Sequence, residues 1–291
     1  MHPANILLPL FSAMLYAVGA LLVKRSSDLG VGIWRTTFVS NIVTALVFQP
    51  LWLLGGTFHA ELLWQPALVA LCYLTGQWLT LFSLDRGDVS VATPVLGLKI
   101  ILVAFFVTLL GSEEVPPKFW FAAVLATAAV ALLGRRGGAR HHHVGVTILT
   151  AGLSAVAFAL FDVLVRRWAP TWGAGCFLPV MMGMVSVCAF VFVPLFREPL
   201  SAVSRPAWPW LLGGTVALAV QSAVFVSTLA VFGNVTAANV VYSSRGLWSV
   251  VAVWLVGHWF VNREQQLGAG VLRWRLAGAA LMMGAIALVL V

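Results

Sequence analysis

Residues Gly87–Gly111, GDVSVATPVLGLKIILVAFFVTLLG, decide the fold, because they form an apolar run of helical length with a lysine, Lys99, near its middle. The pattern returns at a fixed offset of 146 (87 to 233) in Gly233–Gly257, GNVTAANVVYSSRGLWSVVAVWLVG. At that offset Lys99 falls on Arg245. Apolar composition alone does not place a cation at the same depth of two helices, so we interpret the chain as a duplicated membrane protein with a paired positive site.

The duplication extends to the other predicted helices. Leu10–Arg25, LFSAMLYAVGALLVKR, lies over Gly152–Arg167, GLSAVAFALFDVLVRR, at an offset of 142 (12 to 154). The positions that this match pairs are Ser12 with Ser154, Tyr16 with Phe158 and Ala20 with Asp162.

The composition supports the membrane interpretation. Of the 291 residues, 61% are hydrophobic and only 9% are charged, whereas a soluble domain has roughly a quarter charged residues. The net charge is +8, but the basic residues do not gather in a polar domain, so nucleic-acid binding is not expected. Ten apolar segments of spanning length are recognisable: 5–23, 34–54, 63–84, 91–110, 119–133, 144–165, 175–196, 208–231, 237–256 and 272–291.

These segments divide into residues 1–134, a basic polar linker 135–143, and residues 144–291. Each half holds an odd number of spans, five, so the second half must insert with the opposite orientation. We therefore predict an all-α membrane protein of ten transmembrane helices arranged as two inverted five-helix repeats. Inverted repeats are typical of transporters that alternate access around a site near the bilayer midplane.

Several motifs resemble the EamA-like family of the drug/metabolite transporter superfamily. They are Lys24–Arg25 at the end of the first span, Arg35 at the start of the second, GDVSVATPVL…LLGSE (Gly87–Glu113) and PPKFW (Pro116–Trp120). The resemblance covers essentially the whole chain. Many EamA-like members lack a cation in the middle of both the fourth and the ninth span. A lysine there is more similar to the sugar-phosphate and nucleotide-sugar branches.

The resemblance implies a secondary transporter, often an exporter of amino acids or other small metabolites, with a central cavity and no cofactor. We expect amino acids or organic acids as substrates, with exchange of phosphorylated or nucleotide-linked sugars as the alternative. A bacterial inner membrane is the expected location, the lipid bilayer the expected partner, and a homodimer one mode of assembly. The rival classes are an intramembrane enzyme and a subunit without flux. No G-x-S-x-G, H-E-x-x-H or P-loop motif occurs, so an enzyme is not expected.

Lys99 and Arg245 lie too deep in their spans to reach the interface easily. A cation at the bilayer centre costs about 2.5–3.5 kcal/mol, unless a partner offsets it. Asp162 is the acid that lies well within a span, and it can neutralise one cation but not both. Two alternatives stay open: a structural ion pair, or a water-accessible site in which the cations attract an anionic substrate.

Other polar residues share faces with these cations or stand at matching depth. Tyr242 and Ser249 lie on the face of Arg245, and Tyr16 is assigned to the same substrate site. The third and eighth spans each carry polar positions on one face, which we predict to line the cavity: Gln77 and Thr80, and Gln221 and Thr228. The alternative for each is a hydrogen bond between helices.

Pro94 and Gly97 precede Lys99 and are predicted to break the helix, although tight packing explains them equally well. Asp162 is either a proton- or ligand-responsive switch or an i, i+4 partner of Arg166. His141–His143 lie in the polar linker without nearby acids or cysteines, so no metal site is expected. The orientation stays open, since loop cations place the termini outside the cytoplasm whereas the resemblance implies cytoplasmic termini.

Overall fold

The chain is helical throughout the residues that the structure describes. The computed structural model covers residues 3–86, 92, 95–111, 114–133, 144–256 and 269–290, and contains no β-strand among them. The predicted all-α class is therefore confirmed, and the arrangement as ten spans in two inverted repeats stays a prediction.

The described helices follow the predicted apolar segments closely. In the first half they are α1 (Ala4–Asp28), α2 (Ile33–Phe48), α3 (Trp64–Arg86), α5 (Lys99–Leu109) and α6 (Pro117–Leu133). In the second half they are α7 (Val144–Trp172), α8 (Ala174–Cys188), α9 (Trp208–Phe232), α10 (Val235–Tyr242), α11 (Arg245–Val256) and α12 (Ala269–Leu290). The 3₁₀ segments η1 (Gln49–Leu54) and η3 (Ala189–Leu195) extend α2 and α8, and η2 (Ala60–Leu62), η4 (Leu200–Ala202) and η5 (Arg205–Ala207) lie in connections.

Six described segments are long and apolar enough to cross a bilayer. They are Ala4–Asp28, Ile33–Leu54, Ala60–Ser83, Gly145–Trp172, Ala174–Leu195 and Arg205–Phe232. Shorter apolar helices cover Val95–Leu109, Pro117–Leu133 and Leu276–Leu290. Large apolar side chains such as Leu7, Phe121 and Val191 lie on the outside of the bundle, where lipid tails would solvate them. The chain is a multi-pass integral membrane protein.

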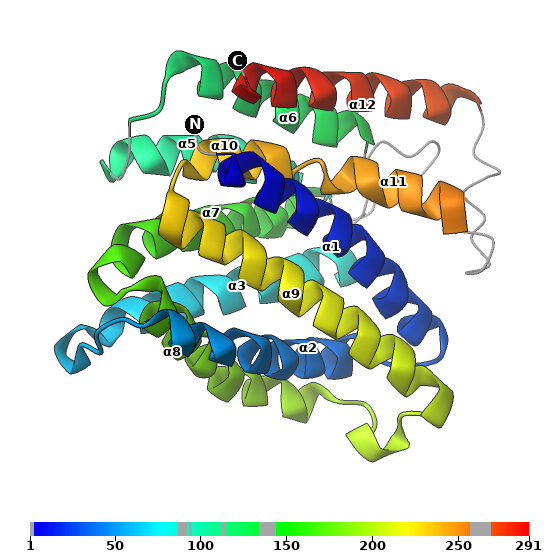
Figure 1. Cartoon of the computed structure of the whole chain (residues 1–291). Coiled ribbons are helices and arrows are strands. Elements are labelled where there is room, and N and C mark those ends of the chain that lie inside the picture. The colour runs from blue at the N-terminus through cyan, green and yellow to red at the C-terminus, as the bar shows by residue number, and fades with distance from the viewer. Residues whose placement is uncertain are drawn as a thin grey trace.

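The helices pack in pairs that recur between the two halves. The helix α1 lies along α9, α3 lies along α7, and α6 lies beside α12 at the opposite side of the bundle from α2 and α8 (Figure 1). The two halves match in sequence, with α1 equivalent to α7 and α3 equivalent to α9. The contact of α1 with α9 is therefore equivalent to the contact of α7 with α3. In the same way α1 contacts α11 and α7 contacts α5. Each cation-bearing helix is thus packed against the first helix of the other half.

Two of the predicted apolar segments are interrupted at the cations. Leu98 lies in a turn, so that α5 begins at Lys99. Ser243 and Ser244 form a turn between α10 and α11, so that α11 begins at Arg245. The backbone N–H groups of Leu98 and Ser244 bond to carbonyls three residues earlier, Val95 and Val241, as in a tight 3₁₀ turn. Interrupted helices persist at membrane depth where they are enclosed by protein.

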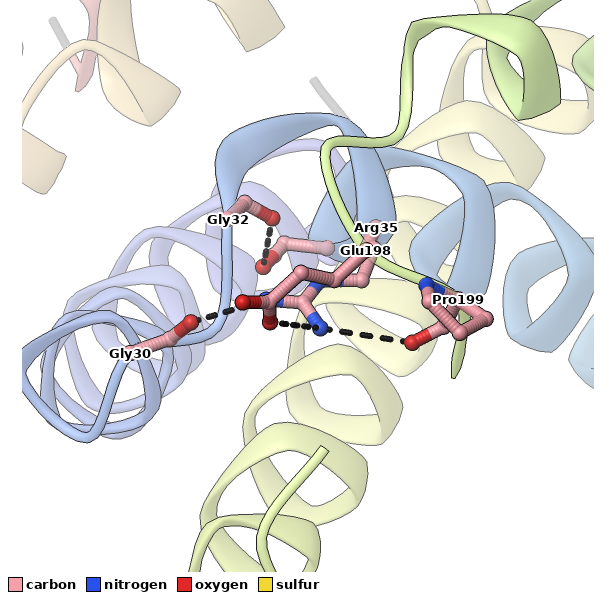
Figure 2. A network of polar contacts seen from close by, with 6 residues as sticks. Gly30, Gly32, Arg35, Glu198 and Pro199 are labelled. Carbon is pink, nitrogen blue, oxygen red and sulfur yellow. Dashed lines mark hydrogen bonds and ion pairs between the residues drawn. The ribbon is translucent and has the colours of Figure 1, made fainter. Parts of the chain in front are cut away.

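A polar contact joins the two halves at the α1–α2 connection (Figure 2). Arg35 Nη1 lies 3.5 Å from Glu198 Oε2 and donates to the carbonyl of Pro199 at 3.4 Å, both beyond the end of η3. Arg35 Nη2 donates to Gly30 O at 2.9 Å. The Arg35 residue is only 6% exposed, so its guanidinium ties the start of α2 to the second half.

The corresponding contact at the α7–α8 connection uses backbone instead of a charge. Thr57 N donates to Trp172 O at 2.8 Å. A Cβ added to Gly56 would lie 2.4 Å from Trp172 O, and one added to Gly175 would lie 2.4 Å from Gly55 O. Glycine is needed at both positions, because the loop after η1 approaches the α7–α8 connection more closely than a side chain permits.

Candidate substrate site

The Lys99 ammonium lies against a carboxylate from the other half. Lys99 Nζ is 2.7 Å from Asp162 Oδ2, and the Asp162 residue on α7 is fully buried. Phe158, one turn before Asp162, places its ring centroid 5.9 Å from Lys99 Nζ. The second oxygen of Asp162, Oδ1, has no hydrogen-bond partner among the described residues. The charge of Lys99 is therefore balanced within the protein, although the carboxylate keeps an open acceptor.

Arg245 lies between two aromatic rings. Its Cζ is 4.8 Å from the ring centroids of both Tyr16 on α1 and Tyr242 on α10. Its Nη1 donates to the Tyr242 hydroxyl at 3.2 Å, and that hydroxyl donates to Gln221 Oε1 at 2.9 Å. Across the described part of the chain no carboxylate lies within ion-pair distance of Arg245. The aromatic faces stabilise the guanidinium without neutralising it.

Phe225 on α9 joins the surroundings of the two cations. Its ring centroid is 5.8 Å from Lys99 Nζ, and it stacks on the Tyr242 ring at 4.2 Å between centroids. Tyr242 in turn holds Arg245. Lys99, Asp162 and Arg245 are therefore neighbours in one aromatic-walled cluster that carries two formal positive charges and one negative charge.

Several buried polar atoms on the helices around this cluster have no hydrogen-bond partner among the described residues. They include Ser12 Oγ on α1, Ser244 Oγ beside Arg245 and Trp248 Nε1 one turn into α11, and also atoms of Asn5, Ser227 and Thr236 on α1, α9 and α10. Ser12 is fully buried and Ser244 is 1% exposed. Buried polar groups are normally hydrogen-bonded, so these atoms mark a region whose hydrogen-bonding capacity the protein itself does not use.

Most of the polar residues predicted to line a cavity bond to neighbouring helices or to their own backbone. Gln77 exchanges amide hydrogen bonds with Asn41 on α2, at 2.9 and 3.2 Å. Thr80 Oγ1 lies 2.7 Å from Ser154 Oγ, and Thr228 Oγ1 donates to Val224 O at 2.7 Å. Among these positions Gln221 is the one that reaches the cluster, through Tyr242.

The remaining predicted residues fall into four situations. Ser249 Oγ donates to Arg245 O within its own helix, at 2.8 Å. Gly97 permits close packing of α6, because a Cβ there would lie 2.9 Å from Val130 Cγ1. Pro94 lies outside the described residues. Asp162, for which Arg166 was one predicted partner, lies beside Lys99 instead, while Arg166 Nη1 donates to Ala230 O at 3.4 Å.

The sequence analysis did not assign Phe158 and Phe225 to the site. Phe158 was noted only as the match of Tyr16, and an apolar ring in a membrane helix usually faces lipid or packing partners. The signal that points to Phe158 is its match with Tyr16, because the two rings border the two matched cations. Within the described ranges, no group of three or more His, Cys, Asp and Glu side chains is placed to hold a metal ion.

Comparison with known proteins bears on the family and the fold. Residues 4–135 match the EamA-like transporter family, which agrees with the resemblance over that part of the chain and is consistent with the drug/metabolite transporter superfamily. A solved structure described as "Crystal structure of protein" matches 99% of this chain and 96% of its own, with a TM-score of 0.77 and 18% identity, so that likeness concerns the fold alone. No curated protein matches the sequence. The family matched over residues 4–135 is one of membrane transporters of the drug/metabolite type.

Proposed function

We propose that this EamA-like protein is a secondary transporter of a small metabolite with one anionic group, an amino acid or an organic acid. It works by alternating access between two oppositely inserted five-helix halves, residues 1–134 and 144–291, joined by the linker 135–143. Export or exchange across a bacterial inner membrane is the physiological setting. The proposal rests on the EamA match together with the cluster around Arg245.

The main support for this proposal is the charge of Arg245, which no carboxylate among the described residues neutralises. Lys99 is paired with Asp162 at 2.7 Å, whereas the recorded polar contact of the Arg245 guanidinium is the neutral Tyr242 hydroxyl. A guanidinium has five N–H donors in a planar fork that suits a carboxylate or a phosphate. An anionic ligand offsets the penalty of about 2.5–3.5 kcal/mol that insertion scales assign to an isolated cation at the bilayer centre.

The neighbouring side chains orient this guanidinium. The rings of Tyr16 and Tyr242, which meet edge to face at 6.4 Å between centroids, each lie 4.8 Å from its Cζ, and Gln221 accepts from the Tyr242 hydroxyl at 2.9 Å. The edge of the guanidinium then presents its remaining N–H groups to a ligand. The rings of Phe225 and Tyr242 form an apolar wall for the rest of the substrate.

A single anionic group on the substrate is favoured over a phosphorylated sugar. A phosphate monoester carries nearly two negative charges near neutral pH and would draw on both cations. Lys99 is already neutralised by Asp162, so the net charge of the three groups is one positive unit. That balance suits a carboxylate.

Asp162 is the proposed coupling residue. Its contact with Lys99 and its unpartnered Oδ1 make it a group whose protonation would change the charge of the cluster. Asp162→Asn is therefore expected to abolish the dependence of transport on pH. An unchanged pH profile in folded Asp162→Asn protein would remove this role.

Transport in proteoliposomes tests the proposal. Purified protein is reconstituted and uptake is followed with radiolabelled amino acids and monocarboxylates, with and without unlabelled counter-substrate inside. We expect saturable uptake stimulated by the counter-substrate, reduced at least tenfold in Lys99→Ala and Arg245→Ala. Arg205→Ala, which removes an exposed cation in η5, is the matched control and keeps parental uptake. Parental rates in both site variants would contradict the site assignment.

A further inference from the structure

We infer that Asp162 is a tethered carboxylate that occupies the anion position of one cation site, and that the equivalent position beside Arg245, at Ala20, receives the carboxylate of the ligand. This inference rests on the proposed function and extends it to the placement of the anionic group. It follows from a comparison of two matched environments. We call them the Lys99 site (Lys99, Ser154, Phe158 and Asp162) and the Arg245 site (Arg245, Ser12, Tyr16 and Ala20).

The two sites are built from equivalent positions of the two halves. The sequence match pairs Lys99 with Arg245, Phe158 with Tyr16 and Ser154 with Ser12. Both cations begin a helix that follows an interruption, and each helix contacts the first helix of the other half, α7 or α1. An aromatic ring from that first helix borders each cation: Phe158 at 5.9 Å from Lys99 Nζ, and Tyr16 at 4.8 Å from Arg245 Cζ.

The carboxylate breaks this equivalence. In the Lys99 site Asp162 stands one turn after Phe158 and reaches the ammonium at 2.7 Å. In the Arg245 site the residue one turn after Tyr16 is Ala20. A methyl group thus stands at the register position at which the other half supplies a carboxylate, and Ala20 is only partly buried. The Arg245 site lacks both the charge and the volume of that group.

The matched serines also differ, because Ser154 is hydrogen-bonded within the protein and Ser12 is not. Ser154 Oγ donates to Gly76 O at 2.7 Å and lies 2.7 Å from Thr80 Oγ1. Ser12 Oγ, at the equivalent position of α1, is fully buried and has no partner among the described residues. Ser244 Oγ, next to Arg245, is likewise buried and unpartnered within that part of the chain. The matched serine of the Lys99 site is satisfied by the protein, whereas the serines assigned to the Arg245 site keep hydrogen-bonding capacity for an added group.

Helix electrostatics add to the demand for an anion at the Arg245 site. The start of a helix carries partial positive charge, so a cation at the first residue of α11 adds to that charge. Asp162 offsets the same combination at the start of α5. At Arg245 the carboxylate of a ligand would offset the charge of the cation and of the helix start, as Asp162 does at Lys99.

Exchange of the carboxylate between the two sites tests this inference, with formate as the probe because it has the size of the missing group. Thermal unfolding of detergent-solubilised protein is followed in sodium formate and in sodium chloride of equal ionic strength. Wild type is expected to be stabilised by formate over chloride. Ala20→Asp supplies a tethered carboxylate to Arg245, so its midpoint should rise without formate and its formate response should fall at least tenfold.

The reciprocal and control variants complete the experiment. Asp162→Ala opens the Lys99 site, so we expect a lower midpoint and a formate response larger than that of wild type. Ala20→Asn adds similar volume without charge, so its midpoint without formate should stay close to that of wild type, unlike that of Ala20→Asp. The inference is overturned if Ala20→Asp responds to formate as strongly as wild type does. It is also overturned if the formate response of Asp162→Ala is no larger than that of wild type. If Ala20→Asp does not fold, the Asp162→Ala result decides.

This readout separates the inference from the transport proposal. Absence of saturable flux in proteoliposomes, with the expected formate pattern intact, would remove the transport proposal and leave the anion position. Saturable flux together with an unaltered formate response in both variants would support the transport proposal and remove the anion position.

Discussion

Lys99 Nζ and Asp162 Oδ2 lie 2.7 Å apart although 63 positions separate the two residues in the chain (99 to 162). Asp162 is fully buried, and the Lys99 side chain is 17% exposed. The contact therefore joins α5 to α7 across the interface of the two halves and balances the charge of Lys99 within the protein.

The first prediction concerns this pair. Lys99→Met alone leaves a buried carboxylate without its counter-ion, and Asp162→Leu alone leaves a cation. Each single substitution should lower the free energy of unfolding by about 3–5 kcal/mol, because breaking a buried pair strands one charge. The double variant should be close to wild type. Unfolding in SDS titrations measures all three, and a double variant as unstable as the sum of the single ones would contradict the prediction.

The second prediction concerns the hydroxyl between Arg245 and Gln221. Tyr242→Phe keeps the ring that faces Arg245 and removes the group that accepts from Arg245 and donates to Gln221. The guanidinium loses its fixed orientation, so KM for uptake should rise about tenfold, corresponding to about 1.4 kcal/mol, with a smaller change in kcat. Tyr73→Phe is the matched control, since no hydrogen bond of that hydroxyl is recorded among the described residues, and its KM should not change.

The third prediction separates the two partners of the contact in Figure 2. Glu198 has a side chain that is 64% exposed, and exposed ion pairs contribute about 0–1 kcal/mol, so Glu198→Gln should change stability by less than 1 kcal/mol. Arg35→Ala should destabilise by about 2 kcal/mol or more, because it also leaves the carbonyls of Gly30 and Pro199 without their donor. Equal losses in the two variants, measured by SDS unfolding, would show that the charge pair dominates.

The fourth prediction concerns the glycines of the α7–α8 connection. Gly175→Ala places a methyl group 2.4 Å from Gly55 O, where the facing atoms are backbone and cannot rotate away. We expect a loss of 3 kcal/mol or more, at the upper end of the range for overpacking, or no folded protein. Gly183→Ala on α8 is the control, because an added Cβ there meets nothing within 4 Å. Fluorescence-detected size-exclusion chromatography with a temperature ramp compares the two, and equal midpoints would refute the steric account.

The sequence predicted the helical class, the general course of the spans and the two special cations, because apolar length and internal repetition are local or periodic signals. It predicted a helix break before Lys99, from Pro94 and Gly97, but not the interruption before Arg245. The stretch Val240–Trp248, VVYSSRGLW, has no proline, and Ser243 and Ser244 are tolerated in membrane helices. The turn depends on tertiary enclosure, which no short window contains.

The polar partners were less predictable for a similar reason. Arg166 is one helical turn from Asp162 and was a natural partner by spacing, whereas the observed neighbour Lys99 comes from another helix. Gln77 was assigned to a cavity because its depth matched that of residues in the other half, and its amide instead pairs with Asn41. Helix periodicity gives the face of a residue but not which helix covers that face.

The close approach of Gly56 and Gly175 to the opposite connection limits how the molecule can move. Two backbones that touch without side chains between them cannot slide past each other by even the width of a methyl group without collision. A conformational cycle that preserves this contact must therefore turn about it. If the two halves rock as proposed, the glycine-paired end of the bundle is the pivot, and the largest displacements belong to the helices farthest from it.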